Sequence, residues 1–108
     1  MGMNKIFLLG RLGKDPSLTE NDGRVMARFT LATNENYKDK DGHTKELTEW
    51  HNIVAFGKRA KACEKFLKKG HNVHIEGRNA TRSYTKNNEN HYITEVQIKE
   101  IQFLDTKD

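Results

Sequence analysis

The segment from Thr48 to Lys58 constrains the fold more than any other, because its residues alternate in character at a period of two. This alternation predicts a β-strand whose successive side chains point to opposite faces. One face would carry Trp50, Asn52, Val54 and Phe56. Two large rings beside an amide are typical of a platform on which nucleic-acid bases stack, although aromatic rings more often fill a core. Taken alone, the strand favours the core interpretation, so the choice depends on the rest of the chain.

The remainder of the chain predicts four further strands, over residues 5–12, 24–33, 72–82 and 91–101. Apolar residues alternate clearly over 24–33, Asn21-Asp22-Gly23 marks a turn before it, and Gly77 interrupts the fourth strand as a bulge would. Residues 58–69 predict a helix that ends at Gly70, with Ala60, Cys63, Phe66 and Leu67 on its apolar stripe. The polar segments 34–46 and 83–90 predict loops.

Three strands, a helix and two strands fit an all-β fold, a five-stranded Greek-key barrel of the OB type with one helix between strands 3 and 4. An SH3-like barrel or an α+β sheet has the same number of strands and stays open as an alternative. The length of 108 residues predicts a single domain, which we expect to span residues 3–105 with no tail after it.

Composition narrows the class of function. The net charge of +4 favours nucleic acid or another acidic surface as the partner. A single cysteine excludes an internal disulfide, and the scattered histidines lack zinc-ligand spacing. No run approaches the roughly 18 apolar residues of a membrane span. We therefore expect a cytoplasmic protein that has no metal, no cofactor and no contact with a membrane.

The sequence holds no paired carboxylates, nucleophile–base arrangement or phosphate-binding loop, so we do not expect an enzyme. It does place tyrosines beside cations in both polar segments: Tyr37 with Lys38 and Lys40, and Tyr84 with Arg82. The loops of an OB barrel frame a groove that binds single strands through base stacking and phosphate contacts. No recognition helix is evident, which argues against reading of a duplex.

A series of short motifs follows one another from about Met3 to about Leu104. They include Gly10-Arg11-Leu12-Gly13-Lys14-Asp15-Pro16, Thr30-Leu31-Ala32-Thr33, Thr48-Glu49-Trp50-His51, Phe56-Gly57-Lys58, Ile75-Glu76-Gly77 and Thr94-Glu95-Val96. In this order they resemble the bacterial single-stranded DNA-binding proteins. The resemblance implies an OB fold and sequence-independent binding of single-stranded DNA in replication, recombination and repair, usually by a homotetramer, with a dimer also possible.

The resemblance also implies roles for individual residues. The family's base-stacking positions are occupied here by Tyr37, Trp50, Phe56 and Tyr84. Its basic positions along the DNA path are occupied by Lys5, Lys40, Lys58, Lys69 and Arg82, and we add Lys38 and Arg78 as candidate phosphate contacts. His51 matches a histidine at the family's subunit interface, and the first strand, with Ile6 and Leu8, agrees with pairing of subunits through that strand.

The main departure from the family lies at the C-terminus. Family members usually continue into a flexible tail whose acidic tip recruits replication and repair proteins, so we do not expect tail-mediated partners here. Two origins stay open as alternatives: a bacterial host protein that acts on the nucleoid, and a form encoded by a phage or mobile element. Two other functions also stay open: an OB-fold accessory protein with weaker DNA binding, and a scaffold whose aromatic face binds protein.

Overall fold

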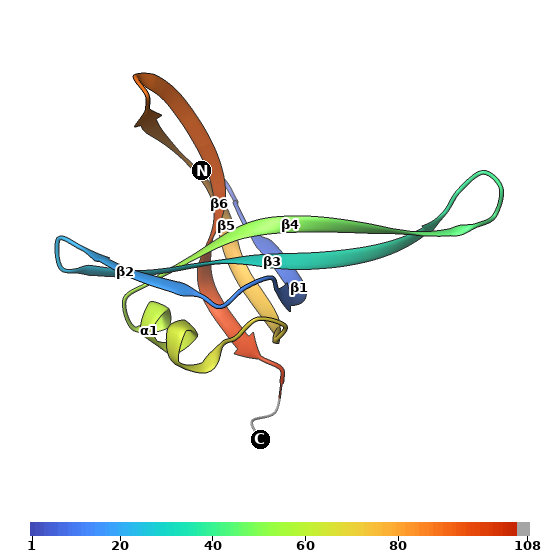
Figure 1. The fold of residues 1–108 in the computed structure, drawn as a ribbon, viewed down its shortest axis with the longest axis horizontal. Helices are drawn as coiled ribbons and strands as arrows, with labels where there is room; N and C mark the ends of the chain where they lie inside the picture. The colour runs from blue at the N-terminus through green and yellow to red at the C-terminus, as the bar shows by residue number, and fades with distance from the viewer. Residues whose placement is uncertain (106–108) are drawn as a thin grey trace.

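The computed structural model describes residues 1–105, which form six strands and one helix (Figure 1). In chain order the elements are β1 (Ile6–Leu12), β2 (Ser17–Asn21), β3 (Arg24–Lys38), β4 (Thr44–Phe56), α1 (Gly57–Phe66), β5 (Asn72–Lys86) and β6 (Glu89–Phe103). The expected absence of a tail falls on the end of the chain, where residues 106–108 lie outside the described residues.

Five of the strands close into a barrel in the order β1, β5, β6, β4 and β3, and β3 returns to β1. β1 closes the ring because residues Ile6 to Arg11 pair with β5 while Arg11 and Leu12 pair with β3. Gly10 permits the close crossing of β1 and β3, since a Cβ there would collide with the backbone carbonyl of Ala32. The expectation of a five-stranded, all-β barrel is confirmed.

β2 is an additional strand that the sequence analysis did not predict. It lies at the outer edge of β3, and all of its residues are exposed. A strand with both faces in water has no apolar alternation, so its sequence cannot be distinguished from that of a loop. The turn expected before β3 is confirmed, because Asp22 and Gly23 have φ angles of 52° and 76° and join the two strands. Within the barrel, the helix follows the third strand as expected.

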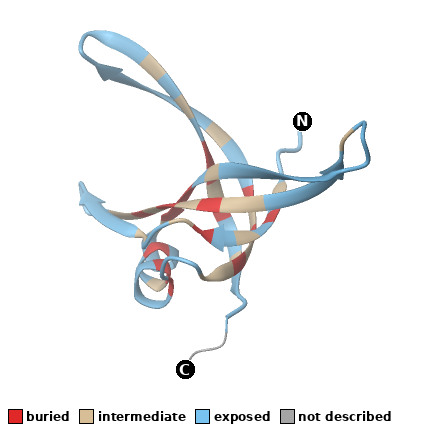
Figure 2. Cartoon of the chain, turned by 45° about the vertical axis from the view of Figure 1, so that its right-hand side comes forward, coloured by how far each residue is buried: buried red, intermediate tan, exposed pale blue. Residues whose placement is uncertain are grey.

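Two long arms, each made of two strands, project from the barrel where loops were predicted (Figure 1). β3 and β4 stay paired as far as Lys38 and Thr44, and β5 and β6 as far as Lys86 and Glu89. The prediction of loops is therefore wrong for most of both segments. The backbone hydrogen bonds between paired strands continue beyond the core, where both faces of the strands are exposed. An alternation of apolar and polar residues requires one buried face, so the sequence of these parts does not show that they are strands. Figure 2 shows the outer parts of both arms as mostly exposed.

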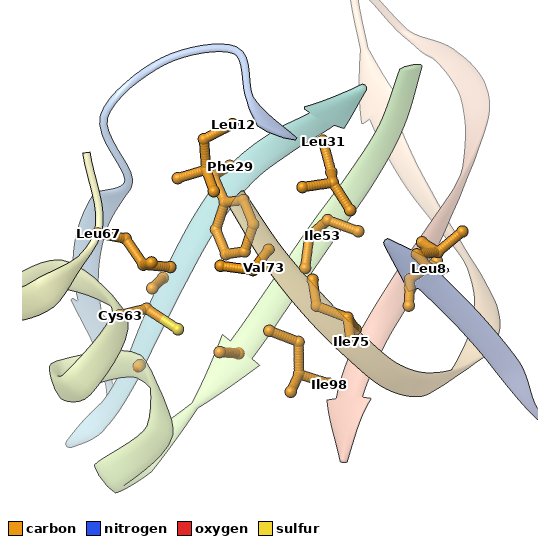
Figure 3. Close-up of a cluster of buried hydrophobic side chains, with 14 residues drawn as sticks. Leu8, Leu12, Phe29, Leu31, Ile53, Cys63, Leu67, Val73, Ile75 and Ile98 are labelled. Atoms are coloured by element: carbon orange, nitrogen blue, oxygen red, sulfur yellow. The ribbon is translucent and has the colours of Figure 1, made fainter. Parts of the chain in front are cut away.

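The core fills the barrel and the space between the barrel and α1 (Figure 3). Its buried side chains include Leu8, Leu12, Ala27, Phe29, Leu31, Ile53, Cys63, Leu67, Val73, Ile75, Val96 and Ile98. The alternation expected over residues 24–33 is confirmed, since Ala27, Phe29 and Leu31 are buried. The bulge expected at Gly77 is also confirmed, because the register between β5 and β6 shifts at that residue.

α1 ends earlier than the sequence predicted. Leu67 follows its last residue in an extended conformation, with φ −101° and ψ 146°, and its side chain is buried in the core. Gly70 is therefore not the helix stop, and its φ of 89° belongs to the turn that leads into β5. Phe66, expected on the buried stripe, is 46% exposed and its ring lies 5.9 Å from that of Phe103. Within residues 1–105, no helix has both the length and the apolar character needed to cross a membrane.

Candidate nucleic-acid interface

Five of the predicted site residues, Trp50, Phe56, Arg78, Arg82 and Tyr84, lie on one outer face of the barrel, which is formed by β3, β4, β6 and β5. Trp50 and Phe56 point away from Ile53 and Ala55, which are buried in the core, because side chains two residues apart share a face. We call this surface the Trp50 face. Its members include Arg28 and Thr30 of β3, Trp50, Asn52, Val54 and Phe56 of β4, Glu95 and Gln97 of β6, and Arg78, Arg82 and Tyr84 of β5.

Trp50 lies on this face with 58% of its surface exposed, so it does not fill the core. One edge of its indole lies against Gly13, in the connection between β1 and β2. A Cβ at Gly13 would lie 2.5 Å from Cζ3 of Trp50 and 2.8 Å from Oγ1 of Thr30. The backbone N–H of Gly13 donates to the carbonyl of Thr30 at 3.0 Å, which fixes Gly13 in its position against the indole. The result is a large ring that is supported at one edge and open to solvent.

Phe56 ends β4 and is half-buried. The guanidinium of Arg24, at the start of β3, lies 4.5 Å from the centroid of its ring. This distance is typical of a cation–π contact. Part of the ring is thus already covered by a cation from the same chain. The sequence analysis missed Arg24, because only the pairing of β3 with β4 brings these residues together.

The two tyrosines lie on different arms and different faces. Tyr84 belongs to the Trp50 face, is 40% exposed and stacks on His91 with ring centroids 5.3 Å apart. The guanidinium of Arg82 lies 5.8 Å from the same ring. Tyr37 is 53% exposed on the arm of β3 and β4, but alternation along β3 points it to the face opposite Trp50. The structure therefore gathers three of the four predicted aromatics on one face.

All seven predicted phosphate contacts are exposed, but two of them already have ion-pair partners. Among the described residues, no ion pair is formed by the other five, Lys38, Lys40, Lys58, Lys69 and Arg78. Arg78 lies on the Trp50 face, and Lys58 follows Phe56 closely in the first turn of α1. Lys5 forms an ion pair with Glu76 at 3.3 Å, on the side of the barrel made by β1 and β5.

Arg82 is the other predicted cation with a partner, and that partner is buried. Its Nε and Nη2 donate to the carboxylate of Glu95 at 2.9 and 3.3 Å. Glu95 is 6% exposed, and Nε of Arg28 lies 3.4 Å from the same carboxylate. These hydrogen bonds raise the pKa of the Arg82 guanidinium above its usual value. The sequence analysis assigned no role to Arg28 or Glu95, because their contact joins strands far apart in the chain.

Within one protomer, the side chains of Ile6 and Leu8, which were predicted at a subunit interface, face the core, and the interface itself stays a prediction. Leu8 is 8% exposed within the core, and Ile6 packs against the core. The apolar side chains that β1 turns outward are Phe7, 58% exposed, and Leu9, 62% exposed. Both faces of this strand are apolar, so the sequence does not reveal which one the barrel covers.

His51 lies near these outward side chains. It is half-buried, and its Nε2 lies 2.9 Å from Oγ1 of Thr33. It lines one shallow recess together with Phe7, Leu9 and Leu47, and Leu47 is itself 51% exposed. The structure therefore groups His51 with exposed apolar side chains, and with Glu35 and Glu49 of the same recess, on the opposite side of β4 from Trp50.

The tip of the arm made by β3 and β4 holds potential metal ligands. Ligand atoms of Asp39, Asp41 and His43 lie within 4.8 Å of one another. Oδ1 of Asp39 already accepts the backbone N–H groups of Asp41 and His43, each at 2.9 Å. The hydrogen bonds of the turn explain this arrangement, and we assign no metal site to it.

Comparison with known proteins is consistent with this geometry. A family model described as the single-strand binding protein family matches residues 3–104. Single-stranded DNA-binding protein 1 of Chlorobaculum tepidum is 47% identical over 110 residues, which cover 99% of this chain and 68% of that protein.

Two solved structures have similar folds. Plasmodium falciparum SSB in complex with ssDNA matches with a TM-score of 0.86 and 34% identity, covering 97% of each chain. A deletion mutant of the single-stranded DNA-binding protein from Thermus aquaticus matches with a TM-score of 0.84 and 27% identity, covering 96% of this chain and 51% of that one.

Proposed function

This chain belongs to the single-strand binding protein family, and we propose that it binds single-stranded DNA without strict sequence choice. The observation that carries the proposal is the state of Trp50, a large ring seated on Gly13 with 58% of its surface in solvent. Exposed aromatic rings on a rigid strand suit base stacking, which contributes roughly 1–3 kcal/mol per base. The solved relative from Plasmodium falciparum is described in complex with ssDNA, which supports the same role.

In this proposal, bases stack on Trp50 and Tyr84, while the partly covered Phe56 supports a further base at the end of β4. Arg78 and Lys58 provide cations beside these rings, and exposed lysines near the tip of the β3–β4 arm continue the path. Tyr37 would take part only where the DNA passes around that arm, because it points away from the Trp50 face. Binding involves no chemical step.

We further propose that the chain acts as a homo-oligomer, a tetramer or a dimer, in bacterial replication, recombination and repair. The support is the outward apolar pair on β1, Phe7 and Leu9, beside His51. Apolar side chains gathered on a surface are typical of a protein–protein contact. The curated relative is bacterial, which supports action in the cytoplasm on a nucleoid, or on DNA of a phage or mobile element.

The first test is titration of the intrinsic fluorescence with oligo-dT at low and high salt. Trp50 is the single tryptophan of the chain, so any quenching reports on this ring. We expect strong quenching by the single strand, little with duplex DNA, and an affinity whose log–log salt slope is about −0.7 per phosphate contacted. Absence of quenching at low salt would overturn the stacking role and favour a scaffold that binds protein.

A matched pair of variants tests which face of the arm formed by β5 and β6 contacts DNA. Tyr84 and Tyr92 are exposed tyrosines on the same arm, 40% and 72% exposed, and alternation directs them to opposite faces. Tyr84→Ala should weaken oligo-dT binding by about fivefold or more, which is the lower limit for one stacked base. Tyr92→Ala should leave it unchanged. Equal losses, or a loss only with Tyr92→Ala, would contradict the assignment of the face.

A further inference from the structure

A buried carboxylate lies on the Trp50 face between two arginines that come from different strands. Glu95 of β6 accepts hydrogen bonds from Arg82 of β5, and Nε of Arg28 of β3 lies 3.4 Å from it. The Glu95 side chain is 7% exposed, whereas those of Arg28 and Arg82 are 41% and 45% exposed. The acid is therefore enclosed, and the two cations reach solvent.

The position of this acid needs a physical explanation. A buried charge is costly unless partners compensate it, and a negative charge beneath a DNA-binding face repels phosphates. Two arginines compensate Glu95, so the cluster carries a net charge of about +1 instead of +2. If attraction for DNA were the only requirement, an uncharged residue in place of Glu95 would serve better. The carboxylate must therefore contribute something besides charge.

The geometry indicates what that contribution is. Nε of Arg28 is enclosed and makes no hydrogen bond to any residue that the structure describes, so its contact with the Glu95 carboxylate is an ion pair at 3.4 Å. Glu95 engages Nε and Nη2 of Arg82, which fixes the plane of that guanidinium. A guanidinium has five N–H donors, so both arginines keep donors on their exposed ends. Arg82 also borders the ring of Tyr84. On the other side of the carboxylate, Arg28, Asn52 and Glu95 line a recess of about 250 Å³.

We propose that Glu95 is a positioning residue for DNA binding, which holds Arg28 and Arg82 in fixed orientations so that their free donors meet phosphodiester groups of one bound strand. This inference rests on the proposed function. Its ligand is the backbone of the strand that stacks on Trp50 and Tyr84. Fixing two long side chains before binding removes an entropic cost of ordering them when DNA arrives.

The decisive variant is Glu95→Gln, because charge and position predict opposite results. By charge alone, removal of an acid should tighten binding to oligo-dT. If Glu95 positions the arginines, affinity should fall about tenfold, and the salt slope should become shallower by about 0.7 for each phosphate that the arginines cease to bind. Glu89→Gln is the matched control, since Glu89 lies exposed on the same strand and makes no ion pair among the described residues. It should leave affinity unchanged or slightly higher.

A second pair of variants keeps the test valid even if Glu95→Gln does not fold. Arg82→Lys and Arg78→Lys both preserve charge, but of these two arginines only Arg82 donates hydrogen bonds to Glu95. Arg82→Lys should therefore weaken binding several-fold more than Arg78→Lys. Where Glu95→Gln does fold, as checked by thermal unfolding, adding Arg82→Lys to it should cause little further loss.

The outcomes separate this inference from the proposed function. If the wild type binds oligo-dT with quenching but Glu95→Gln binds as tightly as Glu89→Gln with an unchanged salt slope, the positioning role is overturned and the proposed function stands. Additive losses in the double variant, or equal losses with Arg82→Lys and Arg78→Lys, also overturn it. If the wild type does not bind oligo-dT at all, the proposed function itself fails.

Discussion

Replacement of Trp50 by alanine separates a stacking residue from a core residue, because the two roles predict different ratios of lost binding to lost stability. Trp50 is 58% exposed, so only about four tenths of its surface is buried in the folded chain. Full burial of a large apolar side chain contributes up to about 3 kcal/mol. The free energy of unfolding should therefore fall by only about 1 kcal/mol.

The effect on binding should be larger. Loss of one stacked base costs roughly 1–3 kcal/mol, which corresponds to an affinity loss of about 5- to 150-fold. Trp50→Phe keeps a ring of smaller area and should lose only part of this affinity. The affinity for oligo-dT should fall from the wild type to Trp50→Phe and again to Trp50→Ala. The free energy of unfolding should change less across the same three proteins.

The assay cannot use intrinsic fluorescence, because Trp50 is the only tryptophan. Anisotropy of a labelled oligo-dT measures binding, and urea unfolding followed by circular dichroism measures stability. An oligonucleotide short enough for one protomer avoids multiplying the effect in an oligomer. If Trp50→Ala loses 3 kcal/mol or more of stability while the folded fraction binds normally, then Trp50 is a structural residue and does not stack on bases.

Gly13→Ala should displace the Trp50 indole, shift its fluorescence emission and weaken oligo-dT binding. In a Trp50→Ala background it should cause little further loss of affinity, and additive losses would contradict the contact between Gly13 and the indole. Leu9→Lys should shift sedimentation toward smaller species without unfolding the chain, whereas Leu8→Lys should unfold it; an unchanged mass with Leu9→Lys would count against the interface. Burial raises the pKa of Cys63 from 9.0 to about 11, so the unfolded chain releases this proton first as pH rises. Relative to Cys63→Ala, stability should therefore fall by about 1.4 kcal/mol per pH unit between those values, and parallel pH profiles would refute this.

Prediction from sequence succeeded where one side of a strand is buried. Residues 24–33 alternate because Ala27, Phe29 and Leu31 enter the core, so burial is recorded in the pattern. It failed for β2 and for the outer arms, where both faces are wet and only backbone pairing maintains the strands. The helix end was misplaced because Leu67 leaves the helix in order to fill the core.

The candidate site was predicted in part. The aromatic residues were recognisable by type, and Trp50, Phe56 and Tyr84 do share a face. Glu95 and Arg24 were not predicted, because the contacts that each one makes join strands that are distant in the chain. No local pattern records such a contact.

Local periodicity and side-chain chemistry were enough to predict the barrel strands, the family resemblance and the residue types able to stack on bases. They did not predict that Tyr37 points away from Trp50, that Leu9 faces outward instead of Leu8, or that Glu95 is enclosed between arginines. The physical reason is the same in each case. Strand register and barrel closure decide which of two faces is covered, and both depend on pairing between distant segments.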